Sequence, residues 1–537
     1  MGMVTGGQLV ARMLKRENVR HVFTLSGLHI APIYAGCVEE GIEVIDTRHE
    51  QAAGNAADAY ARITRGVGVA VVTAVANANA ANAPLLVLAG AAPIFNQSKG
   101  SLQEMEQVDL FHRIAKWSDR VPTPELVPLY MAKAFRVALS GRPGPVFLEL
   151  AWDVLCNAVE EMPLPTGYRS RAGTCADPEK VDEAMALLQQ AERPAIIAGS
   201  SIWWDGAWEQ LRHFAETAQI PVYLNGAGRG CLPPDHPLFF QHTRKEVLSG
   251  ADLVFVIGTP FDFRLNYGQE PTFGAQSRIV QVDIDPVELG RNRSVDVGLI
   301  SDSFSALKAF AESCPRIRRD AYLSAIRENE KRRLRDLEEW TRDDSKPIHH
   351  YRLARELSEV ARAHGDPVFV ADGGNWVAMA AKVIAIDRPG RWLDPGPLGC
   401  LGVGAPFAIA SKLLHPERAV WVVQGDGAFG LNGMDFETAL RFKLPMVCVV
   451  GNDAAWGQIR IPQVQMFGED KSPATLLAPT RYDRIVEALG GRGELVTEPG
   501  QIRPALERAV MSGTVACVNV MLDPEAPVKA GAMGYAV

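Results

Sequence analysis

Two acidic side chains in the last third of the chain follow apolar segments and stand in glycine-containing turns. Asp426 follows the segment 419–424 in a Gly-Asp-Gly-Ala-Phe sequence, and Asp453 follows 445–450 in Gly-Asn-Asp-Ala-Ala-Trp. If both segments are strands of one parallel sheet, their carboxyl ends share an edge where ligands bind. Carboxylates suit Mg²⁺, and glycine lets backbone N–H groups approach a phosphate. Asp and Gly are also common in ordinary turns, so either acid alone indicates little.

The order and spacing of these motifs make the pair more specific. A Gly-Asp-Gly motif, then a helix and an apolar strand, and then an Asn-Asp pair resemble the fingerprint of thiamine diphosphate enzymes. The resemblance implies that Asp426, Asp453 and the main-chain carbonyl of Ala455 hold Mg²⁺. Asp453 stands where the family more often has Asn, but a carboxylate is also a good Mg²⁺ ligand. Four further residues would then border the cofactor: Gly425, Gly427, Ala428 and Trp456.

A glutamate in the first third of the chain supports the same resemblance. Glu50 ends the sequence Asp-Thr-Arg-His-Glu and precedes a predicted helix rich in small residues. In this family such a glutamate contacts the aminopyrimidine ring and promotes deprotonation of the reactive thiazolium carbon. A glutamate that opens a helix is also explained by the helix dipole alone. Together with the Gly-Asp-Gly motif, however, Glu50 is interpreted as catalytic.

Two more glycine-containing segments resemble cofactor contacts of the family. In residues 398–404 the resemblance assigns Leu401 to the space under the bent cofactor and the carbonyl of Gly399 to its amino group. Close helix–strand packing is an alternative role for this segment, and both can hold. After the apolar segment 367–372, three residues resemble the loop that covers the diphosphate: Gly373, Gly374 and Asn375.

Short β-branched segments alternate with helical patterns along most of the chain, which is typical of parallel sheets with helices on both faces. We therefore expect an α/β protein with three doubly wound parallel-sheet domains. In the terms of the resemblance these are a pyrimidine-binding domain, a central domain and a diphosphate-binding domain. Their expected ranges are 1–160, 180–315 and 350–525, followed by a C-terminal tail at 526–537. A linker is predicted at 157–180, and a charged helix with a connector at 315–348.

Composition excludes several classes of protein. The 55 basic and 63 acidic residues give a net charge of −8, which argues against nucleic-acid binding. No apolar stretch approaches the length of a membrane span, and the N-terminus does not resemble a signal peptide. The eight cysteines form no CxxC pair or metal-binding spacing, which is typical of thiols in a reducing compartment. We expect a cytoplasmic protein.

Closer similarity narrows the reaction. Residues 26–29 (Ser-Gly-Leu-His) and the pair Leu102-Gln103 resemble benzaldehyde lyase, whereas 258–268 and 391–404 resemble the 2-hydroxyacyl-CoA lyases often labelled acetolactate-synthase-like. The resemblance implies a carbon–carbon lyase or carboligase, with reversible cleavage of a 2-hydroxyacyl-CoA to an aldehyde and formyl-CoA as the leading activity. Benzoin cleavage or ligation and acetolactate synthesis are the alternatives.

Two polar residues are candidates for contacts with the substrate. His29 follows a predicted strand, so it could act as an acid or base, or donate a hydrogen bond to a substrate hydroxyl. Gln103 could bind a reacting hydroxyl group without becoming charged. An ordinary loop residue is the alternative for each, and the motif context favours a functional role. The implied substrates are 2-hydroxyacyl-CoA, acyloins, 2-keto acids and aldehydes.

Two segments do not follow the family pattern closely. After residues 67–74 the usual Gly-Pro-Gly loop beside the pyrimidine is missing, and the chain continues directly into Val75. In the central domain, residues 282–293 could hold an adenine nucleotide, a CoA moiety or nothing, and FAD is the less favoured ligand. Asp283 and Asp285 in this segment could simply cap the strand end.

Other classes of function remain as alternatives. A dinucleotide-binding dehydrogenase would need G-x-G-x-x-G after its first strand, which is absent here. A non-catalytic thiamine-diphosphate-binding relative would be expected to lack the activating carboxylate, whereas Glu50 is present. The resemblance also implies a homodimer or homotetramer with active sites between subunits.

Overall fold

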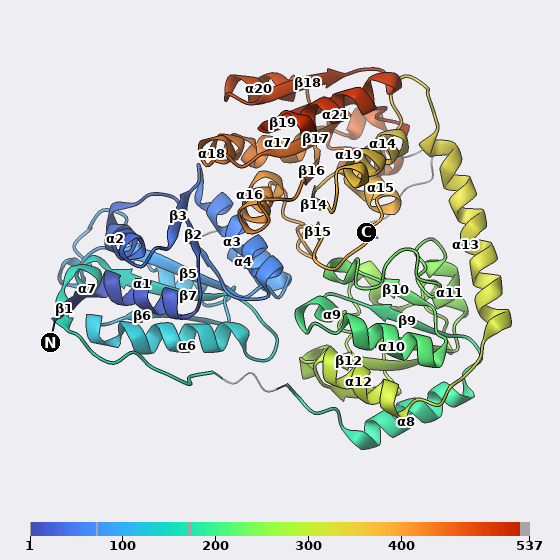
Figure 1. Cartoon of the computed structure of the whole chain (residues 1–537), viewed down its shortest axis with the longest axis horizontal. Helices are drawn as coiled ribbons and strands as arrows, with labels where there is room; N and C mark the ends of the chain where they lie inside the picture. The colour runs from blue at the N-terminus through green and yellow to red at the C-terminus, as the bar shows by residue number, and fades with distance from the viewer. Residues whose placement is uncertain (1, 71–73, 170–172, 527–537) are drawn as a thin grey trace. The chain divides into compact units, whose positions relative to one another are not determined.

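The computed structural model of the chain describes residues 2–70, 74–169 and 173–526. By their contacts these residues form two compact units. The first contains residues up to 169 together with 395–417 and 428–445, and the second contains 173–394, 418–427 and 446–526. Three large parallel sheets, each flanked by helices, make up most of the chain (Figure 1).

A six-stranded parallel sheet forms the core of the first unit, in the order β3-β2-β4-β5-β7-β6. Successive side chains of a strand point to opposite faces. On one face, apolar side chains from β2, β5 and β7 pack with α1 (Gly6–Arg16), α2 (Ala31–Glu39) and α6 (Val127–Leu139). The strands are β2 (His21–Thr24), β3 (Glu43–Asp46), β4 (Gly68–Ala70), β5 (Leu85–Ala91), β6 (Trp117–Val121) and β7 (Val146–Ala151).

Helix α3 (Glu50–Thr64) packs against α16 (Gly404–Leu414) within the first unit. Its small side chains allow a close approach to β4, where a Cβ on Gly68 would lie 1.9 Å from the carbonyl oxygen of Ala57. The buried Asp58 accepts two hydrogen bonds of 2.7 Å from Arg62, whose guanidinium lies 5.1 Å from the ring centroid of Phe407. These contacts hold the helix that begins with Glu50.

The second sheet lies in the second unit and has five parallel strands in the order β10-β9-β11-β12-β13. Its apolar residues form one buried core with α8 (Pro178–Gln190), α10 (Trp208–Ala218) and α12 (Ser303–Ser313). The strands are β9 (Pro194–Ala198), β10 (Val222–Leu224), β11 (Leu253–Ile257), β12 (Arg278–Asp283) and β13 (Val297–Ile300).

The third sheet also has six parallel strands, in the order β15-β14-β16-β17-β19-β18. Helices α14 (His350–Ala363), α15 (Asn375–Val383) and α21 (Ile502–Met511) cover one apolar face of it. The order places β14, β16 and β17 next to one another, so the polar residues that follow these strands share one edge. The strands are β14 (Val368–Asp372), β15 (Trp392–Leu393), β16 (Val420–Gly425), β17 (Met446–Asn452), β18 (Arg492–Val496) and β19 (Val515–Met521).

These sheets confirm the expected α/β class with three parallel sheets. The charged segment is also helical as predicted, over α13 (Asp320–Thr341), where only a few side chains such as Leu323 and Ile326 are buried. The predicted linker is wrong in one detail, because β8 (Ala158–Glu160) pairs with β1 (Met3–Thr5) as a short antiparallel sheet. The exposed backbone of a linker can satisfy its hydrogen bonds by such pairing without an apolar pattern.

Three further expectations concern particular parts of the chain. All eight cysteines are free thiols. In the part of the chain that the structure describes, no helix is both long and apolar enough to cross a membrane. Of the segment that precedes the missing Gly-Pro-Gly loop, residues 71–73 are outside the described residues, as are residues 527–537 of the predicted tail, whereas Val75 begins helix α4 (Val75–Ala80).

Candidate active site

Asp426 lies where β16 ends and is the first residue of α17 (Asp426–Asn432). Its Oδ1 accepts a hydrogen bond of 2.9 Å from the N–H of Gly427. Its Oδ2 is buried and has no hydrogen-bond partner among the described residues. The indole of Trp456 covers Gly427 so closely that a Cβ there would lie 2.6 Å from the ring. The sequence therefore places a buried carboxylate near the indole ring of Trp456. One oxygen of this carboxylate accepts a hydrogen bond, and the other has no partner among the described residues.

Asp453 directly follows β17, the strand beside β16. Its Oδ1 accepts a hydrogen bond of 3.2 Å from the N–H of Ala455. The intervening Ala454 has φ of 52°, in the left-handed region, and its N–H donates to Asn452 Oδ1 at 3.1 Å. This strained turn bends the chain back toward Asp453.

Burial makes both carboxylates difficult to ionise. Burial raises the pKa of Asp426 to about 6, although the N–H groups of Gly427, Ala454 and Ala455 oppose the shift. Burial also raises the pKa of Asp453 to about 7, and the negative charge of Asp426 adds to this increase. A divalent cation between the two groups would remove their repulsion and favour the ionised form of each.

The loop after β14 lies against the loop after β16. Gly373 accepts a hydrogen bond of 3.2 Å from the N–H of Gly425, and a Cβ on Gly374 would contact the Cα of Gly425 at 3.6 Å. Gly374 has φ of 100°, which a glycine adopts readily. Asn375 then begins α15, and its side-chain Nδ2 is buried without a hydrogen-bond partner among the described residues.

Gly457, the first residue of α19 (Gly457–Phe467), connects these two groups of residues. A Cβ on Gly457 would lie 2.5 Å from Asn375 Nδ2 and 2.7 Å from Asp453 Oδ2. The absence of a side chain on Gly457 therefore leaves room for the Asn375 amide, which has no hydrogen-bond partner among the described residues, and for Asp453 Oδ2. The sequence motifs did not single out Gly457; its only signal was a glycine directly after Trp456 at the start of a helical pattern.

The first unit contains the other predicted site residues. Glu50 is the first residue of α3, and its side chain is 41% exposed at the carboxyl edge of the sheet. The preceding His49 caps the helix by accepting a hydrogen bond of 3.0 Å from the N–H of Gln51. Glu50 lies 3.8 Å from His49 Nδ1. The glutamate is therefore accessible and belongs to a firmly packed helix.

His29 and Gln103 both lie near the end of β5. His29 belongs to the 3-10 turn Leu28–Ile30, and a Cβ on Gly90 of β5 would lie 2.6 Å from the His29 Cβ. Gln103, with φ of 60°, lines a small cavity that also contains the residue after Gly90, Ala91. Glu104 accepts hydrogen bonds from the N–H groups of residues 98, 100 and 101 and so holds the Gln103 loop.

The segment with Gly399 and Leu401 also belongs to the first unit. Gly399 has φ of 68°, and its N–H donates to the carbonyl of Gly396 at 3.1 Å. Leu401 is half-buried. The carbonyl of Gly402 accepts a hydrogen bond of 2.7 Å from Asn432, which ties the segment to the region after Ala428. Ala428 itself is buried.

The structure thus brings the predicted residues together in two groups. In the second unit these are Gly373, Gly374, Asn375, Gly425, Asp426, Gly427, Asp453, Ala455 and Trp456, and in the first unit they are His29, Glu50, Gln103, Gly399, Leu401 and Ala428. No group of three or more His, Cys, Asp or Glu side chains suited to a metal is found among the described residues. A cation at Asp426 and Asp453 would therefore need other oxygen donors, such as a backbone carbonyl or phosphate oxygens.

The predicted nucleotide segment of the central domain has local structural roles. Asp283 accepts a hydrogen bond of 2.9 Å from the N–H of Asp285. Asp285 in turn accepts one of 3.1 Å from the N–H of Val287 and caps the 3-10 turn Pro286–Glu288. These contacts agree with the simpler alternative for the two acids, a cap on the strand end.

Comparison with known proteins identifies the family. Residues 4–110 match the profile described as thiamine pyrophosphate enzyme, N-terminal TPP binding domain. Residues 181–310 match the central domain of the same enzymes, and residues 372–520 match their C-terminal TPP binding domain. The chain belongs to the thiamine pyrophosphate enzyme family. The resemblance noted in the sequence is confirmed.

Several full-length relatives of this thiamine pyrophosphate enzyme carry names that differ in activity. A protein of Mycobacterium bovis named "Probable acetolactate synthase" is 38% identical over 531 residues, which cover 96% of each chain. The "2-hydroxyacyl-CoA lyase 2" of Caenorhabditis elegans is 35% identical, covering 92% of this chain and 84% of the relative. The human protein of the same name is 34% identical, with coverage of 92% and 86%.

The residues of the second unit fit the group that gives the thiamine pyrophosphate enzyme family its name. A diphosphate with a divalent cation needs glycine-lined backbone, anionic ligands and unpaired donors. The loops after β14 and β16 supply the glycine-lined backbone, and Asp426 and Asp453 supply the anionic ligands. The buried Nδ2 of Asn375 supplies the unpaired donor. A carbon–carbon lyase or an acyloin-forming enzyme fits this family and its named relatives.

Proposed function

We propose that this chain is a Mg²⁺-dependent thiamine diphosphate enzyme of the 2-hydroxyacyl-CoA lyase type. It would cleave a 2-hydroxyacyl-CoA between the carbinol carbon and the acyl carbon, giving an aldehyde and formyl-CoA, and would join the same fragments in reverse. The observation that carries the Mg²⁺–thiamine diphosphate part of the proposal is the buried pair Asp426 and Asp453, each with a raised pKa, beside two glycine-rich strand ends. The lyase type is supported by the relatives named "2-hydroxyacyl-CoA lyase 2".

Thiamine diphosphate, when bound, supplies a carbon nucleophile and an electron sink for cleavage beside a carbonyl group. Asp426, Asp453 and the carbonyl of Ala455 would hold the Mg²⁺, and Gly373, Gly374 and Asn375 would border the diphosphate. Glu50 would hold a proton exchanged with the pyrimidine ring. Support for this role comes from its accessible position at the start of the packed helix α3.

His29 and Gln103 would act on the substrate. In the cleavage direction the substrate's hydroxyl group loses its proton as it becomes the aldehyde carbonyl, and His29 is proposed to accept this proton. Gln103 would orient the same hydroxyl with its side-chain amide. The positions of both residues near the end of β5 support a shared role.

A second candidate is acetolactate synthase, favoured by the 38% identity to the relative named "Probable acetolactate synthase". Benzoin cleavage or ligation is a third candidate, supported by the sequence around His29 and Gln103. A non-catalytic relative is disfavoured by the presence of Glu50. The three reactions differ in what lies beside the carbon that reacts: a thioester, an aryl ketone or a carboxylate.

Product analysis separates these candidates. The protein, loaded with thiamine diphosphate and Mg²⁺, is supplied in parallel with a 2-hydroxyacyl-CoA, benzoin and pyruvate, and the products are identified by mass spectrometry. The proposal expects aldehyde and formyl-CoA from the first substrate at the highest kcat/KM. Acetolactate from pyruvate as the dominant product would overturn it in favour of the second candidate, and benzaldehyde from benzoin would favour the third.

A further inference from the structure

The turn that leads to Glu50, residues 46–49, lies at an edge of the first sheet. It follows β3, the first strand in the sheet order, which pairs with β2 alone in the described sheet. From the side of β2, the carbonyl of Thr24 accepts a hydrogen bond of 2.8 Å from the N–H of Thr47. At an edge strand the remaining backbone groups need partners from outside the sheet.

A residue far along the chain supplies one of these partners. Asp435, which is 387 positions from Arg48, accepts a hydrogen bond of 2.9 Å from the Arg48 N–H through its Oδ1. The hydroxyl of Thr438 donates to the same oxygen at 3.3 Å, and Asp435 is only 1% exposed. Burial raises the pKa of Asp435, and the N–H of Arg48 opposes this shift. The turn before Glu50 thus provides a hydrogen bond that a buried carboxylate requires.

Arg441 binds the beginning of the same turn. Its Nη1 lies 2.5 Å from Asp46 Oδ1, and its Nη2 donates to the main-chain carbonyl of Asp46 at 2.8 Å. Two donors of one planar guanidinium fix the orientation of the group that they bind as well as its position. The side chains of Arg48 and Glu437 form a further pair at 3.7 Å, which is partly exposed and contributes little.

The segment that carries Asp435 and Arg441 is itself firmly packed. Asp435 ends the 3-10 turn Gly433–Asp435, and Arg441 ends the helix α18 (Phe436–Arg441) that follows directly. Phe436 is fully buried, and its ring stacks on that of Phe429 with centroids 5.6 Å apart. This segment and the turn before Glu50 both belong to the first unit. The two supports of the turn are therefore anchored in its own unit.

The position of Glu50 depends on this turn. Glu50 is the first residue of α3, and its side chain is 41% exposed and lies 3.8 Å from His49 Nδ1. Where such a side chain points is set mainly by the backbone that leads into the helix. A displacement of about 1 Å between reacting groups can lower a rate by about 10²-fold.

We propose that Asp435 and Arg441 are positioning residues for Glu50. They hold the turn 46–49 so that the Glu50 carboxylate keeps the place from which it can exchange a proton with the pyrimidine ring. The inference rests on the proposed role of Glu50, but it is independent of which carbon–carbon bond the enzyme cleaves. It has two separate consequences, one for the order of the turn and one for activation of the cofactor.

Amide hydrogen exchange of the full chain without cofactor measures the order of the turn. Asp435→Ala and Arg441→Ala should each speed up exchange of the N–H groups of residues 46–50 at least about tenfold. Asp435→Asn keeps an oxygen that can accept from Arg48, so it should retain the wild-type protection. The Arg441 side chain is 35% exposed, so its replacement tests the proposal even if Asp435→Ala does not fold.

Deuterium exchange at the thiazolium carbon measures activation of the cofactor. The chain is saturated with thiamine diphosphate and Mg²⁺ in deuterated water without substrate, quenched with acid and examined by NMR. Asp435→Ala and Arg441→Ala should slow this exchange by about 10- to 10²-fold, whereas Asp435→Asn should exchange nearly as the wild type does. Glu50→Gln should be slowed by about 10²- to 10⁴-fold. Cofactor affinity, measured separately, should change little in all four variants.

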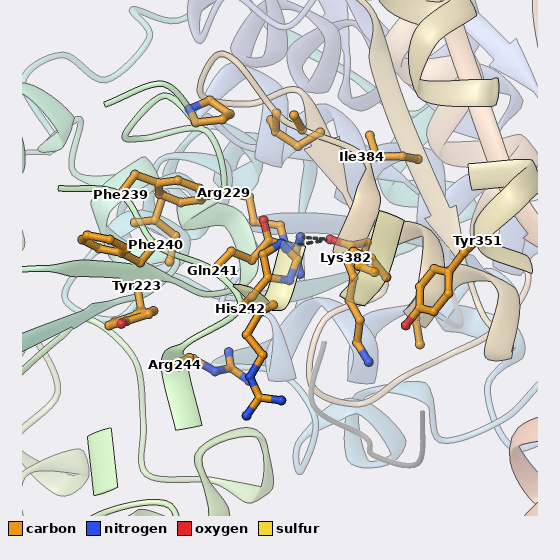
Figure 2. A pocket seen from close by; sticks show the side chains of 18 of the residues that line it. Tyr223, Arg229, Phe239, Phe240, Gln241, His242, Arg244, Tyr351, Lys382 and Ile384 are labelled. Carbon is orange, nitrogen blue, oxygen red and sulfur yellow. Dashed lines mark hydrogen bonds between the residues drawn. The ribbon is translucent and has the colours of Figure 1, made fainter. Parts of the chain in front are cut away.

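Two further basic residues provide controls. Arg12→Ala removes an ion pair with Glu161 on the surface of the same unit. Lys382→Gln changes an exposed side chain of the second unit, which Figure 2 shows among the residues that line a cavity of about 450 Å³. All residues that line this cavity lie between positions 223 and 386. Both controls should match the wild type in both exchange measurements.

The outcomes separate this inference from the proposed role of Glu50. Fast deuterium exchange in Glu50→Gln would refute that role and the inference with it. Slow exchange in Glu50→Gln, with wild-type behaviour of Asp435→Ala and Arg441→Ala, would refute the inference alone. A change in only one of the two exchange measurements would also overturn it, because positioning requires both. A matching loss of cofactor affinity would show that the two residues support the fold rather than Glu50.

Discussion

At the residue scale, the chemistry of this protein depends on polar side chains that are expensive to bury. Asp426 and Asp453 are kept together at a strand edge although burial raises the pKa of both and the charge of Asp426 raises that of Asp453 further. A fold that needed only a strand-end turn could place Asn or Ser at these positions without that cost. The simplest physical reason to keep both carboxylates is a cation that they share.

Replacement of either acid should therefore remove most of the stabilisation that Mg²⁺ and thiamine diphosphate together give to the fold. In a thermal-shift titration, thiamine diphosphate and Mg²⁺ together should stabilise the wild type, by about 2.7 kcal/mol at a ligand concentration of a hundred times Kd. Asp426→Ala and Asp453→Ala should lose most of this stabilisation, and the exposed control Asp470→Ala should retain it. Equal stabilisation of all four proteins would show that the pair does not hold the metal.

Glu50→Gln should remove turnover while leaving the fold and most of the cofactor affinity intact. The change keeps the shape of the side chain but removes the group that exchanges a proton with the pyrimidine. The loss of a proton-transfer group typically costs about 10²- to 10⁴-fold in rate. Steady-state kinetics, with cofactor affinity measured separately, tests this expectation, and activity above a tenth of the wild-type value, an order-of-magnitude threshold, would contradict it.

His29→Ala should lower kcat for carbon–carbon cleavage far more than it lowers cofactor affinity. The 3-10 turn that carries His29 packs on Gly90 through its backbone and Cβ, so alanine preserves the packing. We expect a decrease in kcat of about 10²-fold. His112→Ala, at an exposed position of the same unit, is the matched control. A parallel fall in cofactor affinity would mean that His29 is structural.

His350 should make stability depend on pH. It is fully buried with neither ring nitrogen hydrogen-bonded to a described residue, and burial lowers its pKa from 6.5 to about 3, with His349 adding to the decrease. The folded state thus favours neutral His350, and its contribution to stability is complete above pH 6.5. That contribution falls by about 1.4 kcal/mol per pH unit as the pH decreases toward 3.

Urea unfolding at several pH values between these limits measures this dependence. His350→Leu should flatten the decline of the unfolding midpoint at acidic pH, because leucine cannot take up a proton in the unfolded chain. His112→Gln, which removes an exposed histidine, should leave the decline as it is in the wild type. An unchanged slope in His350→Leu would show that this buried histidine does not control acid stability.

At the scale of elements, the candidate site depends on helices that begin where strands end. Helix α15 begins with Asn375, α17 with Asp426 and α19 with Gly457, each after a parallel strand of the third sheet or the turn that follows it. Neighbouring strands therefore bring together three chain segments that are far apart in the sequence. Close approach between these segments requires glycine at the crossing points.

Gly457→Ala tests this requirement. The added Cβ would meet the side-chain ends of Asn375 and Asp453, which can turn away at little cost to the fold. Turning them away should lower the Mg²⁺-dependent affinity for thiamine diphosphate at least about tenfold, with little change in the unfolding temperature. Gly500→Ala, at a glycine with no neighbour within 4 Å of an added Cβ, provides the control. Unchanged cofactor affinity in Gly457→Ala would remove Gly457 from the site.

At the scale of the whole molecule, the two groups of site residues belong to two compact units of the chain. From the family resemblance we propose that the active form is at least a dimer, with Glu50 of one subunit and Asp426 of the other serving one site. A dimer with two-fold symmetry has two equivalent sites of this kind.

Co-refolding of two different inactive variants tests whether each site is shared between subunits. Glu50→Gln and Asp426→Ala chains should each be inactive alone. In a heterodimer one site carries both lesions and the other carries neither, so co-refolding should restore part of the activity. If both residues came from one chain, every site would carry a lesion. Inactive material that contains proven heterodimers would therefore refute the shared site.

The sequence alone was sufficient for the parts of this protein that depend on local pattern. Alternating apolar strands and helices predicted the α/β class, and the Gly-Asp-Gly and Asn-Asp motifs predicted the family, because such turns are short and nearly continuous in sequence. Glycine and acidic residues at strand ends are constrained by neighbours within a few positions. The strand β8 was missed because edge pairing needs only free backbone groups.

Only the tertiary structure revealed how residues distant in the sequence affect one another. The raised pKa values of Asp426 and Asp453 arise from burial, and for Asp453 also from the charge of Asp426 on the neighbouring strand, which no local pattern encodes. Gly457 matters because its missing side chain leaves space for Asn375 and Asp453. Electrostatic energy depends on distance in space, whereas sequence motifs report distance along the chain.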